Sequence, residues 1–298
     1  MLYTVSIILR KLIRDLIIVV VLSSLIVSFY KFNSSIHPDM VVDERTPQHT
    51  VLEYENITFN STDDLVLKGW FIPAVNKVED TLAPTVIVMH GTGLNKSHAL
   101  DWSYYLADEY NLFLFDFRGH GASEGNKTTF GNKETKDLLG AIEYIKTRPD
   151  VDGNKLAVFG YEMGADVGII TATITSDIRL IIADSPHDRL THKFDGLFEE
   201  YWILQKPLSW LAGLWSSVII QTSPASVAPV DNIQYTTAPL FIMAGENSIS
   251  GAGVQDIFDN SVAAGSEIWT VPGSHHSLFF SHREEFKEKV REFLDNNI

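Results

Sequence analysis

The sequence predicts an α/β domain with a doubly wound, mainly parallel sheet, a helical cap insertion and an N-terminal transmembrane helix. Short apolar runs that enter Gly, Pro or acidic turns have the length of strands buried in a parallel sheet, and helical patterns separate most of them. A long apolar segment precedes these runs, within residues 1–31. The chain has 298 residues, 45% of them hydrophobic, which suffices for one such domain, and nothing argues for two.

Residues 1–31 are predicted to form a short cytoplasmic stub and a transmembrane signal-anchor. The run from Leu16 to Tyr30 is almost entirely apolar, and Arg10, Lys11 and Arg14 precede it. A spanning helix needs about 20 apolar residues. Because the cationic side stays in the cytoplasm, we expect a single-pass protein of the cell membrane whose C-terminal domain lies outside the cytoplasm. The alternative is a cleaved signal peptide and a secreted protein, although no clear Ala-x-Ala site follows the run.

A polar linker is predicted over residues 32–50, and the folded domain over residues 51–298. Five N-x-[ST] sequons fit an exported chain, although such short motifs also occur by chance. They lie at Asn33, Asn56, Asn60, Asn95 and Asn126. The sequon at Asn95 falls on the expected rim of the active site, where a glycan would obstruct entry.

The domain is predicted to begin with an antiparallel hairpin over residues 51–59 and 65–72. Six further strands are expected to begin at Thr85, Asn111, Lys155, Arg179, Ala238 and Ser266. Helical patterns occupy residues 97–110 and 132–148, and apolar residues recur at helical spacing near the C-terminus. In such a sheet, ligands bind at the carboxyl ends of the strands.

Residues 187–229 do not fit the alternation of strands and helices. This segment is rich in aromatic residues and has no strand pattern, so we expect a helical cap over the sheet. It is either an ordinary packed insertion or a lid that lines an apolar pocket or touches the membrane.

Four strand ends carry distinctive motifs. They are His90-Gly91-Thr92-Gly93, the sequence DFRGHGASEG from Asp116, Gly160-Tyr161-Glu162-Met163-Gly164, and Gly273-Ser274-His275-His276. In this order, over roughly residues 51–294, the chain resembles the α/β-hydrolase superfamily, close to its serine-aminopeptidase-like and monoacylglycerol-lipase-like branch. The resemblance implies an α/β-hydrolase fold, with a nucleophile on a sharp turn between the fifth strand and the following helix.

The resemblance also implies the roles of the site residues. Hydrolases of this kind need a nucleophile, a base, an acid that orients the base, and two N–H donors that form the oxyanion hole. By resemblance, His276 is the base, with His275 as the next candidate, and the backbone N–H groups of Thr92 and Met163 form the oxyanion hole.

The acid position is substituted. The family has Asp where this chain has Ser248. Glu246 lies nearby, but its spacing is wrong by two residues, and Asp256 and Asp259 are further away. We therefore expect the orienting acid to be missing or displaced, which leaves the catalytic triad degenerate.

The nucleophile position is occupied by Glu162, which has no hydroxyl group to acylate. Serine-type hydrolysis through this residue is therefore excluded. One interpretation is a non-catalytic homologue that binds a small apolar ligand or a protein partner, with Glu162 and His276 forming an ion pair.

Two other interpretations keep an enzyme. Glu162 could act as a carboxylate nucleophile or general base, as the elbow Asp does in haloalkane dehalogenases and epoxide hydrolases. Alternatively, the working serine of a hydrolase of small esters or amides lies elsewhere, at Ser97, Ser123 or Ser185.

Composition and motifs exclude several other classes. A net charge of −15 leaves no basic surface for nucleic acid. The chain has no cysteine, and its histidines, including His187 and His192, lack the spacing of a metal-binding helix, so no metal site is predicted. The glycines of DFRGHGASEG are not followed by the G-K-[ST] of a nucleotide-binding loop, and no cofactor is expected.

Overall fold

The structure is a computed structural model that describes residues 2–38, 45–76, 81–246, 251–272 and 278–298. Eight strands of these residues form one sheet, in the order β1-β2-β4-β3-β5-β6-β7-β8. The strands are β1 (Glu55–Asn60), β2 (Val66–Ile72), β3 (Thr85–Met89), β4 (Asn111–Phe115), β5 (Leu156–Tyr161), β6 (Ile178–Asp184), β7 (Leu240–Gly245) and β8 (Glu267–Val271). Strand β2 pairs antiparallel with β1 and β4, and the pairs from β4 to β8 are parallel. The predicted mainly parallel α/β architecture is confirmed.

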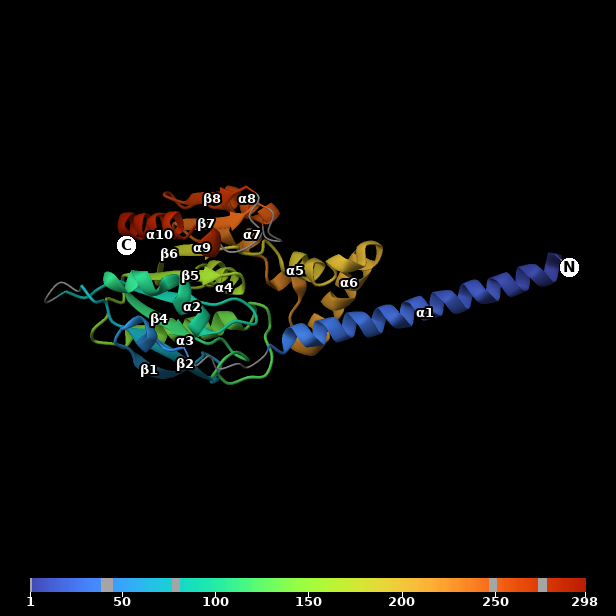
Figure 1. Cartoon of the computed structure of the whole chain (residues 1–298), viewed down its shortest axis with the longest axis horizontal. Helices are drawn as coiled ribbons and strands as arrows, with labels where there is room; N and C mark the ends of the chain where they lie inside the picture. Colours follow the sequence, from blue (N-terminus) through green and yellow to red (C-terminus); the bar gives the residue numbers. More distant parts are fainter. Residues whose placement is uncertain (1, 39–44, 77–80, 247–250, 273–277) are drawn as a thin grey trace.

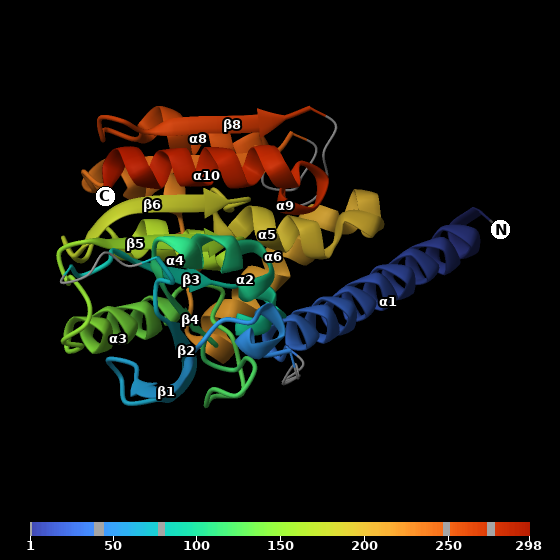
Figure 2. The same cartoon turned by 60° about the vertical axis from the view of Figure 1, so that its left-hand side comes forward.

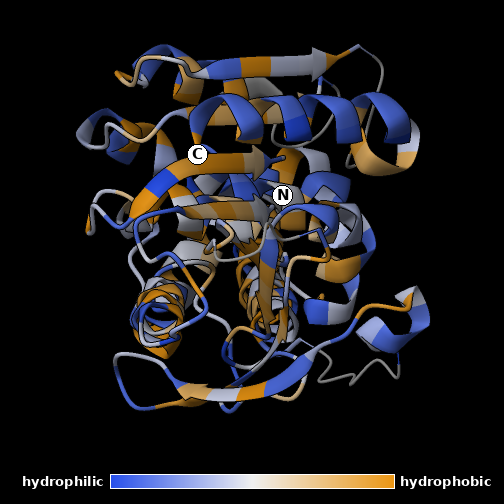
Figure 3. Ribbon diagram, turned by 90° about the vertical axis from the view of Figure 1, so that its left-hand side faces the viewer, coloured by the Kyte–Doolittle hydropathy of each residue, from blue (hydrophilic) through white to orange (hydrophobic). Residues whose placement is uncertain are grey.

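Helices cover both faces of the sheet, as Figures 1 and 2 show. One face packs against α3 (Glu134–Lys146), α4 (Met163–Thr171), α7 (Pro229–Asn232) and α8 (Gly251–Asn260), and the other against α2 (Lys96–Ser103), α9 (Leu278–Ser281) and α10 (Arg283–Asn297). In β3, Ile87 and Met89 face the first helix layer, and Val86 and Val88 face the second. This alternation explains why the central strands are apolar throughout, and Figure 3 shows the hydrophobic colour gathered on them.

The cap segment, residues 187–229, leaves the sheet after β6 and contains no strand among its residues, all of which are described. Its helical elements are α5 (Leu190–Leu197), the 3₁₀ turn η3 (Glu199–Leu204), α6 (Gln205–Trp215), the π-helical turn η4 (Ser216–Ile220) and the 3₁₀ turn η5 (Pro224–Ser226). Another 3₁₀ turn, η6 (Ile233–Tyr235), follows α7, and η2 (Tyr104–Asp108) follows α2. Helices α5 and α6 lie at the end of the domain from which the N-terminal helix projects (Figure 1).

The N-terminal helix α1 (Leu2–Ile36) is longer than the predicted membrane segment. Its residues 6–36 are long and apolar enough to cross a membrane, and most of this stretch is exposed. The helix continues through residues 32–36, which the sequence assigns to a linker, because Phe32 and Ile36 are fully buried against the cap. A further 3₁₀ turn, η1 (Pro47–Thr50), occupies the end of the predicted linker.

Burial of Ile36 gives a test of this docking. Replacing Ile36 with Val removes one buried methylene and should lower the free energy of unfolding by about 1 kcal/mol. The matched control is Ile26→Val in the same helix, where the side chain is 68% exposed and a change near zero is expected. Thermal unfolding of the full chain in detergent measures both. Equal effects at the two positions would contradict the docking of α1 on the cap.

Candidate functional site

The candidate site is built on the sharp turn between β5 and α4. Glu162 occupies the turn with φ 51° and ψ −116°, a strained conformation for a residue with a side chain. A Cβ atom on Gly160 would lie 2.2 Å from the backbone of Gly164, and one on Gly164 would lie 2.6 Å from the carbonyl oxygen of Met89. Both glycines are therefore required by close backbone contacts, and the turn projects the Glu162 side chain beyond the carboxyl end of β5.

The Glu162 carboxylate is held by two groups from distant parts of the chain. The backbone N–H of Thr92 donates to its Oε2 atom over 3.1 Å. The ammonium group of Lys193, on α5 of the cap, donates to Oε1 and also to the Thr92 hydroxyl, over 3.0 Å. The side chain of Lys193 is 11% exposed and that of Glu162 is 26% exposed. This pair, which spans cap and sheet, therefore lies largely away from water.

The surroundings of Glu162 favour its ionised form. Burial alone raises the pKa of a carboxyl group, but the charges of Lys193 and His187 and hydrogen bonds from Lys193 and Thr92 outweigh burial. They hold the pKa of Glu162 below its ordinary value of 4.5. Glu162 is therefore an anion at neutral pH, paired with a cation.

The lowered pKa predicts a pH dependence of stability. A carboxyl group whose pKa is lower in the folded state adds stability above its unfolded pKa, and this stability is lost as the pH falls through the folded pKa. The advantage of the native chain over Glu162→Gln should therefore be full above about pH 5 and should shrink as the pH falls through and below 4.5. Thermal unfolding of both proteins across this range measures it. A difference that does not change with pH would contradict the assignment.

A histidine and an aspartate lie next to this pair. His187 follows β6 and lies with its Nε2 atom 3.7 Å from Glu162 Oε1. Asp166, on the first turn of α4, accepts from the backbone N–H of His187 over 2.7 Å and lies 2.9 Å from its Nδ1 atom. Burial raises the pKa of Asp166, and the charge and hydrogen bonds of His187 oppose the rise. Asp166 thus fixes the ring of His187 with its Nε2 atom toward Glu162.

The DFRGHGASEG motif supports the loop that carries Thr92. His120 accepts the N–H of Gly93 at its Nε2 atom over 3.2 Å, and His90 accepts the N–H of Phe117 over 3.1 Å. Both rings are buried, and burial lowers the pKa of both, which keeps them neutral acceptors. Asp116 accepts the N–H of Lys96, after the loop, over 2.8 Å. The motif therefore has a structural role: it supports the loop that holds the backbone N–H of Thr92 in position.

A pocket of about 490 Å³ lies over the Glu162 carboxylate. Thr92 and Glu162 line it at the carboxyl ends of the strands, and the cap segment lines it with His187, Lys193, Gly196 and Leu197. Its remaining walls are Gly93, Phe130 and the end of α1 with residues that follow it: Ser34, Ser35, His37 and Pro38. A small molecule would fit between the cap and the carboxyl ends of the strands, where ligands bind in doubly wound sheets.

A family model described as the alpha/beta hydrolase family matches residues 86–289. The chain belongs to the alpha/beta hydrolase family. The uncharacterized protein YfhR of Salmonella typhimurium is 32% identical over 160 residues, 53% of each chain. The alpha/beta hydrolase domain-containing protein WAV2 of Arabidopsis thaliana is 28% identical over 171 residues, 56% of this chain and 52% of that protein. The chain thus spans about half the length of these curated relatives.

Among solved structures, an esterase from Pyrococcus furiosus is similar over most of both chains. The TM-score is 0.72 with 26% sequence identity, and the match covers 88% of this chain and 98% of the esterase. The structural likeness therefore covers more of the chain than the family model, which matches residues 86–289.

Two predicted site residues of this alpha/beta hydrolase family member lie outside the described residues. They are the base His276, with its alternative His275, and the substituted acid position Ser248. The three other candidates for the orienting acid lie within the described residues, and all three are exposed: Glu246, Asp256 and Asp259. Of the two predicted oxyanion-hole donors, Thr92 contacts Glu162 through its N–H, and Met163 is the first residue of α4.

The three alternative serines each have their hydroxyl proton committed to another acceptor. Ser97 donates to the Arg45 carbonyl over 3.0 Å, and Ser123 donates to the Asp116 carbonyl over 2.6 Å. Ser185 donates to the Asp184 carboxylate over 2.9 Å. A hydroxyl has a single proton to give, so this geometry does not favour any of the three as a nucleophile activated by histidine.

Three residues of the site were not predicted from the sequence: Lys193, His187 and Asp166. His187 follows a strand end, and Asp166 is an acidic residue in the small-residue start of the helix after the turn; both signals were present in the sequence. His187 was weighed only as a metal ligand, and among the described residues no His, Cys, Asp or Glu cluster suits a metal. For Lys193 there was no signal, because the packing of the cap alone brings it to Glu162.

The sequon at Asn95 also has a structural role. Asn95 is 4% exposed, and its side chain caps α2 by accepting the N–H of Ser97 over 3.0 Å. Glycosylation of Asn95 would require this hydrogen bond at the N-terminus of α2 to break.

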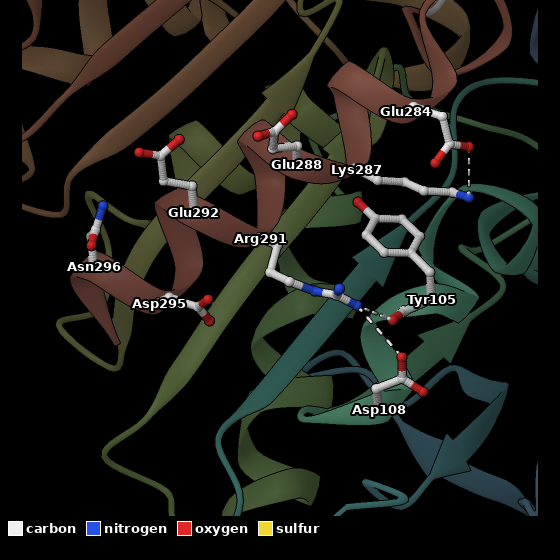
Figure 4. A pocket seen from close by; sticks show the side chains of 9 residues that line it. All are labelled: Tyr105, Asp108, Glu284, Lys287, Glu288, Arg291, Glu292, Asp295 and Asn296. Atoms are coloured by element: carbon white, nitrogen blue, oxygen red, sulfur yellow. Dashed lines mark hydrogen bonds and ion pairs between the residues drawn. The ribbon is translucent and has the colours of Figure 1, made fainter.

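A second, larger pocket of about 740 Å³ lies between η2 and α10, and none of the residues discussed above lines it. Figure 4 shows that charged side chains line it and that both basic side chains, Lys287 and Arg291, have interaction partners. Arg291 donates to the Tyr105 carbonyl over 2.9 Å and lies 3.6 Å from Asp108, and Lys287 donates to Glu284 over 3.3 Å. This pocket has the character of a solvated charged groove.

Proposed function

We propose that this α/β-hydrolase-fold protein binds a small ligand in the Glu162 pocket and does not carry out serine-type hydrolysis. One observation supports this above all. A carboxylate with no acylable hydroxyl occupies the nucleophile position, accepts the Thr92 N–H predicted to stabilise an oxyanion, and is neutralised by Lys193. The donor that a transition state would need is therefore already used in the resting protein.

The degenerate triad is part of the same proposal. His276 keeps the type of residue needed at the base position, but Ser248 and Glu162 replace the acid and the nucleophile. Backbone donors at Thr92 and Met163 do not depend on side-chain identity. The oxyanion hole is therefore retained in this proposal while the nucleophile is lost.

Membrane anchoring by α1 is the third part. Residues 6–36 suit a membrane span, with Arg10, Lys11 and Arg14 on the side that stays in the cytoplasm. The folded domain would then lie outside the cytoplasm. The alternative, a cleaved signal peptide, is disfavoured because residues 27–36 of α1 contribute to the buried cluster under the cap.

The experiment uses p-nitrophenyl butyrate with the full chain in detergent. We expect no release of p-nitrophenol above background, together with binding that saturation-transfer NMR detects. The control Leu197→Trp narrows the pocket and should reduce the transfer. If native protein releases p-nitrophenol and Leu197→Trp abolishes the release, the pocket is a hydrolase site and the proposal is wrong.

A second candidate function rests on His187. With Nε2 at 3.7 Å from Glu162 Oε1 and Asp166 behind it, His187 is placed to activate a water beside a carboxylate nucleophile. Glu162 Oε1 would attack the carbon of an epoxide or alkyl halide, the carbon–oxygen or carbon–halogen bond would break, and an ester would form. His187 would then take a proton from water, which attacks the ester carbonyl and releases the alcohol.

Oxygen labelling tests this alternative. In a single turnover of styrene oxide in H₂¹⁸O, the alternative predicts ¹⁸O in the Glu162 carboxylate and unlabelled oxygen in the diol. The ion pair with Lys193 argues against it, because the attacking oxygen is held by an ammonium group. We expect no turnover and no label on Glu162.

A further inference from the structure

The length of α1 fixes the level at which a membrane would end, given the proposed anchoring on which this inference rests. Lys11 and Lys31 are 20 positions apart, which is about 30 Å along a helix and matches the hydrocarbon core of a bilayer. Tyr30, 73% exposed, stands at the boundary, where aromatic residues are favoured. Arg14 and Asp15, which pair with each other over 2.8 Å, lie within about one helical turn of Lys11, so they belong to the cytoplasmic end of this range. The outer boundary of the bilayer therefore lies near Lys31.

The cap reaches this level. Glu200, in η3, forms an ion pair with Lys31 over 2.7 Å, and the Lys31 ammonium lies 5.8 Å from the ring of Tyr201. The next two residues, Trp202 and Ile203, are 83% and 76% exposed. Two bulky apolar side chains thus follow directly on the residues that contact α1 at the boundary.

The exposed Trp202 has an unfavourable backbone conformation. Trp202 has φ 35° and ψ −91°, which breaks the helical path of η3. Such a conformation in a bulky residue is strained, and strained conformations of this kind cluster at functional sites. In water, exposure of the apolar tryptophan ring is itself unfavourable, so it does not offset the backbone strain.

Helix α6 continues the apolar surface. Trp210, Leu214 and Val218 follow at intervals of four along α6 and η4, so they share one face, and they are 66%, 45% and 75% exposed. The opposite face, with Leu208 and Ala212, is buried in the cluster that includes α1. Helix α6 therefore packs along α1 with one face and presents an apolar stripe with the other.

We propose that this cap apolar surface inserts into the interfacial layer of the same bilayer that α1 crosses. The surface consists of Trp202, Ile203, Leu204, Trp210, Leu214 and Val218. A bilayer is the fitting occupant because the ion pair of Lys31 and Glu200 sets the surface at the level where α1 leaves the hydrocarbon. An interface takes up tryptophan and aliphatic side chains in this way.

Insertion of the cap apolar surface into the bilayer would bring the Glu162 pocket close to the membrane. Ser34 and Ser35, which line the pocket, follow Lys31 by three and four positions, or roughly 5–6 Å along the helix. A ligand that partitions into the lipid interface would reach the pocket with little travel through water.

Because the chain contains no cysteine, a fluorescent label can be attached at a single introduced cysteine to test for insertion. Single variants Trp202→Cys and Val218→Cys of the full chain are labelled with the fluorophore NBD and reconstituted into phosphatidylcholine vesicles. Some vesicles contain lipid with a nitroxide near the headgroup. Tyr30→Cys reports on α1, and Ile174→Cys, 57% exposed and beyond the far end of α4, is the matched control away from the cap.

We expect the nitroxide lipid to lower the fluorescence at positions 202 and 218 by about twofold, as at position 30, and to leave position 174 unchanged. Quenching at 30 without quenching at 202 and 218 would overturn this inference and leave the anchor intact. No quenching at 30 would reject the anchor and the inference together. Blue-shifted but unquenched labels at 202 and 218 would mean that a protein surface covers the cap, which also overturns it.

Discussion

Glu162→Ser is expected to turn the chain into a measurable esterase, with hydrolysis of p-nitrophenyl acetate rising about 100-fold above the native protein. The substitution supplies a hydroxyl on the strained turn and frees the Thr92 N–H that the carboxylate now occupies. Loss of a single oxyanion donor costs about 100- to 1000-fold in known hydrolases, so its release matters as much as the hydroxyl.

Glu162→Ala is the matched control, because it frees the Thr92 N–H without providing a nucleophile, and it should remain inactive. Two double variants identify the base: loss of the new activity with His187→Ala points to the His187–Asp166 pair, and loss with His276→Ala points to the residue predicted by resemblance. Adding Ser248→Asp should raise the activity further if the acid position is merely substituted. A native chain that hydrolyses the ester as fast as Glu162→Ser would contradict the proposed function.

Lys193→Met is expected to lower the free energy of unfolding by about 2 kcal/mol at neutral pH. The substitution leaves an ionised Glu162 without its cation in a site that is only 26% exposed on the Glu162 side. The same change should raise the pKa of Glu162, because the charge that opposes burial is removed. Thermal unfolding of the full chain in detergent measures the loss.

The double variant Lys193→Met with Glu162→Gln provides the control. It removes both charges, so most of the lost stability should return, and the mutant cycle gives the interaction between the two side chains. Lys206→Met serves as a matched surface control, since Lys206 is 76% exposed in its pair with Asp195 and should change stability by less than about 0.5 kcal/mol. If Lys193→Met were as mild as Lys206→Met, the pair would not hold the cap to the sheet.

The sheet could be predicted from the sequence because strand burial leaves a local pattern. Runs such as residues 85–89 and 156–160 are apolar on both faces, and a parallel sheet covered by two helix layers requires this. Gly160 and Gly164 could be recognised for a similar reason, since their spacing reflects one turn and its two close contacts. At these positions, the local sequence pattern was enough to predict the structure.

Lys193 and the end of α1 could not be predicted in this way. The position of Lys193 depends on how α5 folds back over the sheet, and no local pattern records that path. The polar residues after Tyr30 suggested a linker, but helix α1 continues because Phe32 and Ile36 are buried against the cap. At the end of α1, tertiary packing overrode the local signal, and at Lys193 tertiary packing alone determined the position.

The most direct test of the central claim is intact-mass analysis after treatment with a fluorophosphonate, a reagent that adds covalently to an activated serine. We expect no adduct on the native chain and a single adduct on Glu162→Ser, located at position 162 by peptide mapping. An adduct on the native chain would show that a working serine exists elsewhere and that the chain is a serine hydrolase, and the modified peptide would identify that serine.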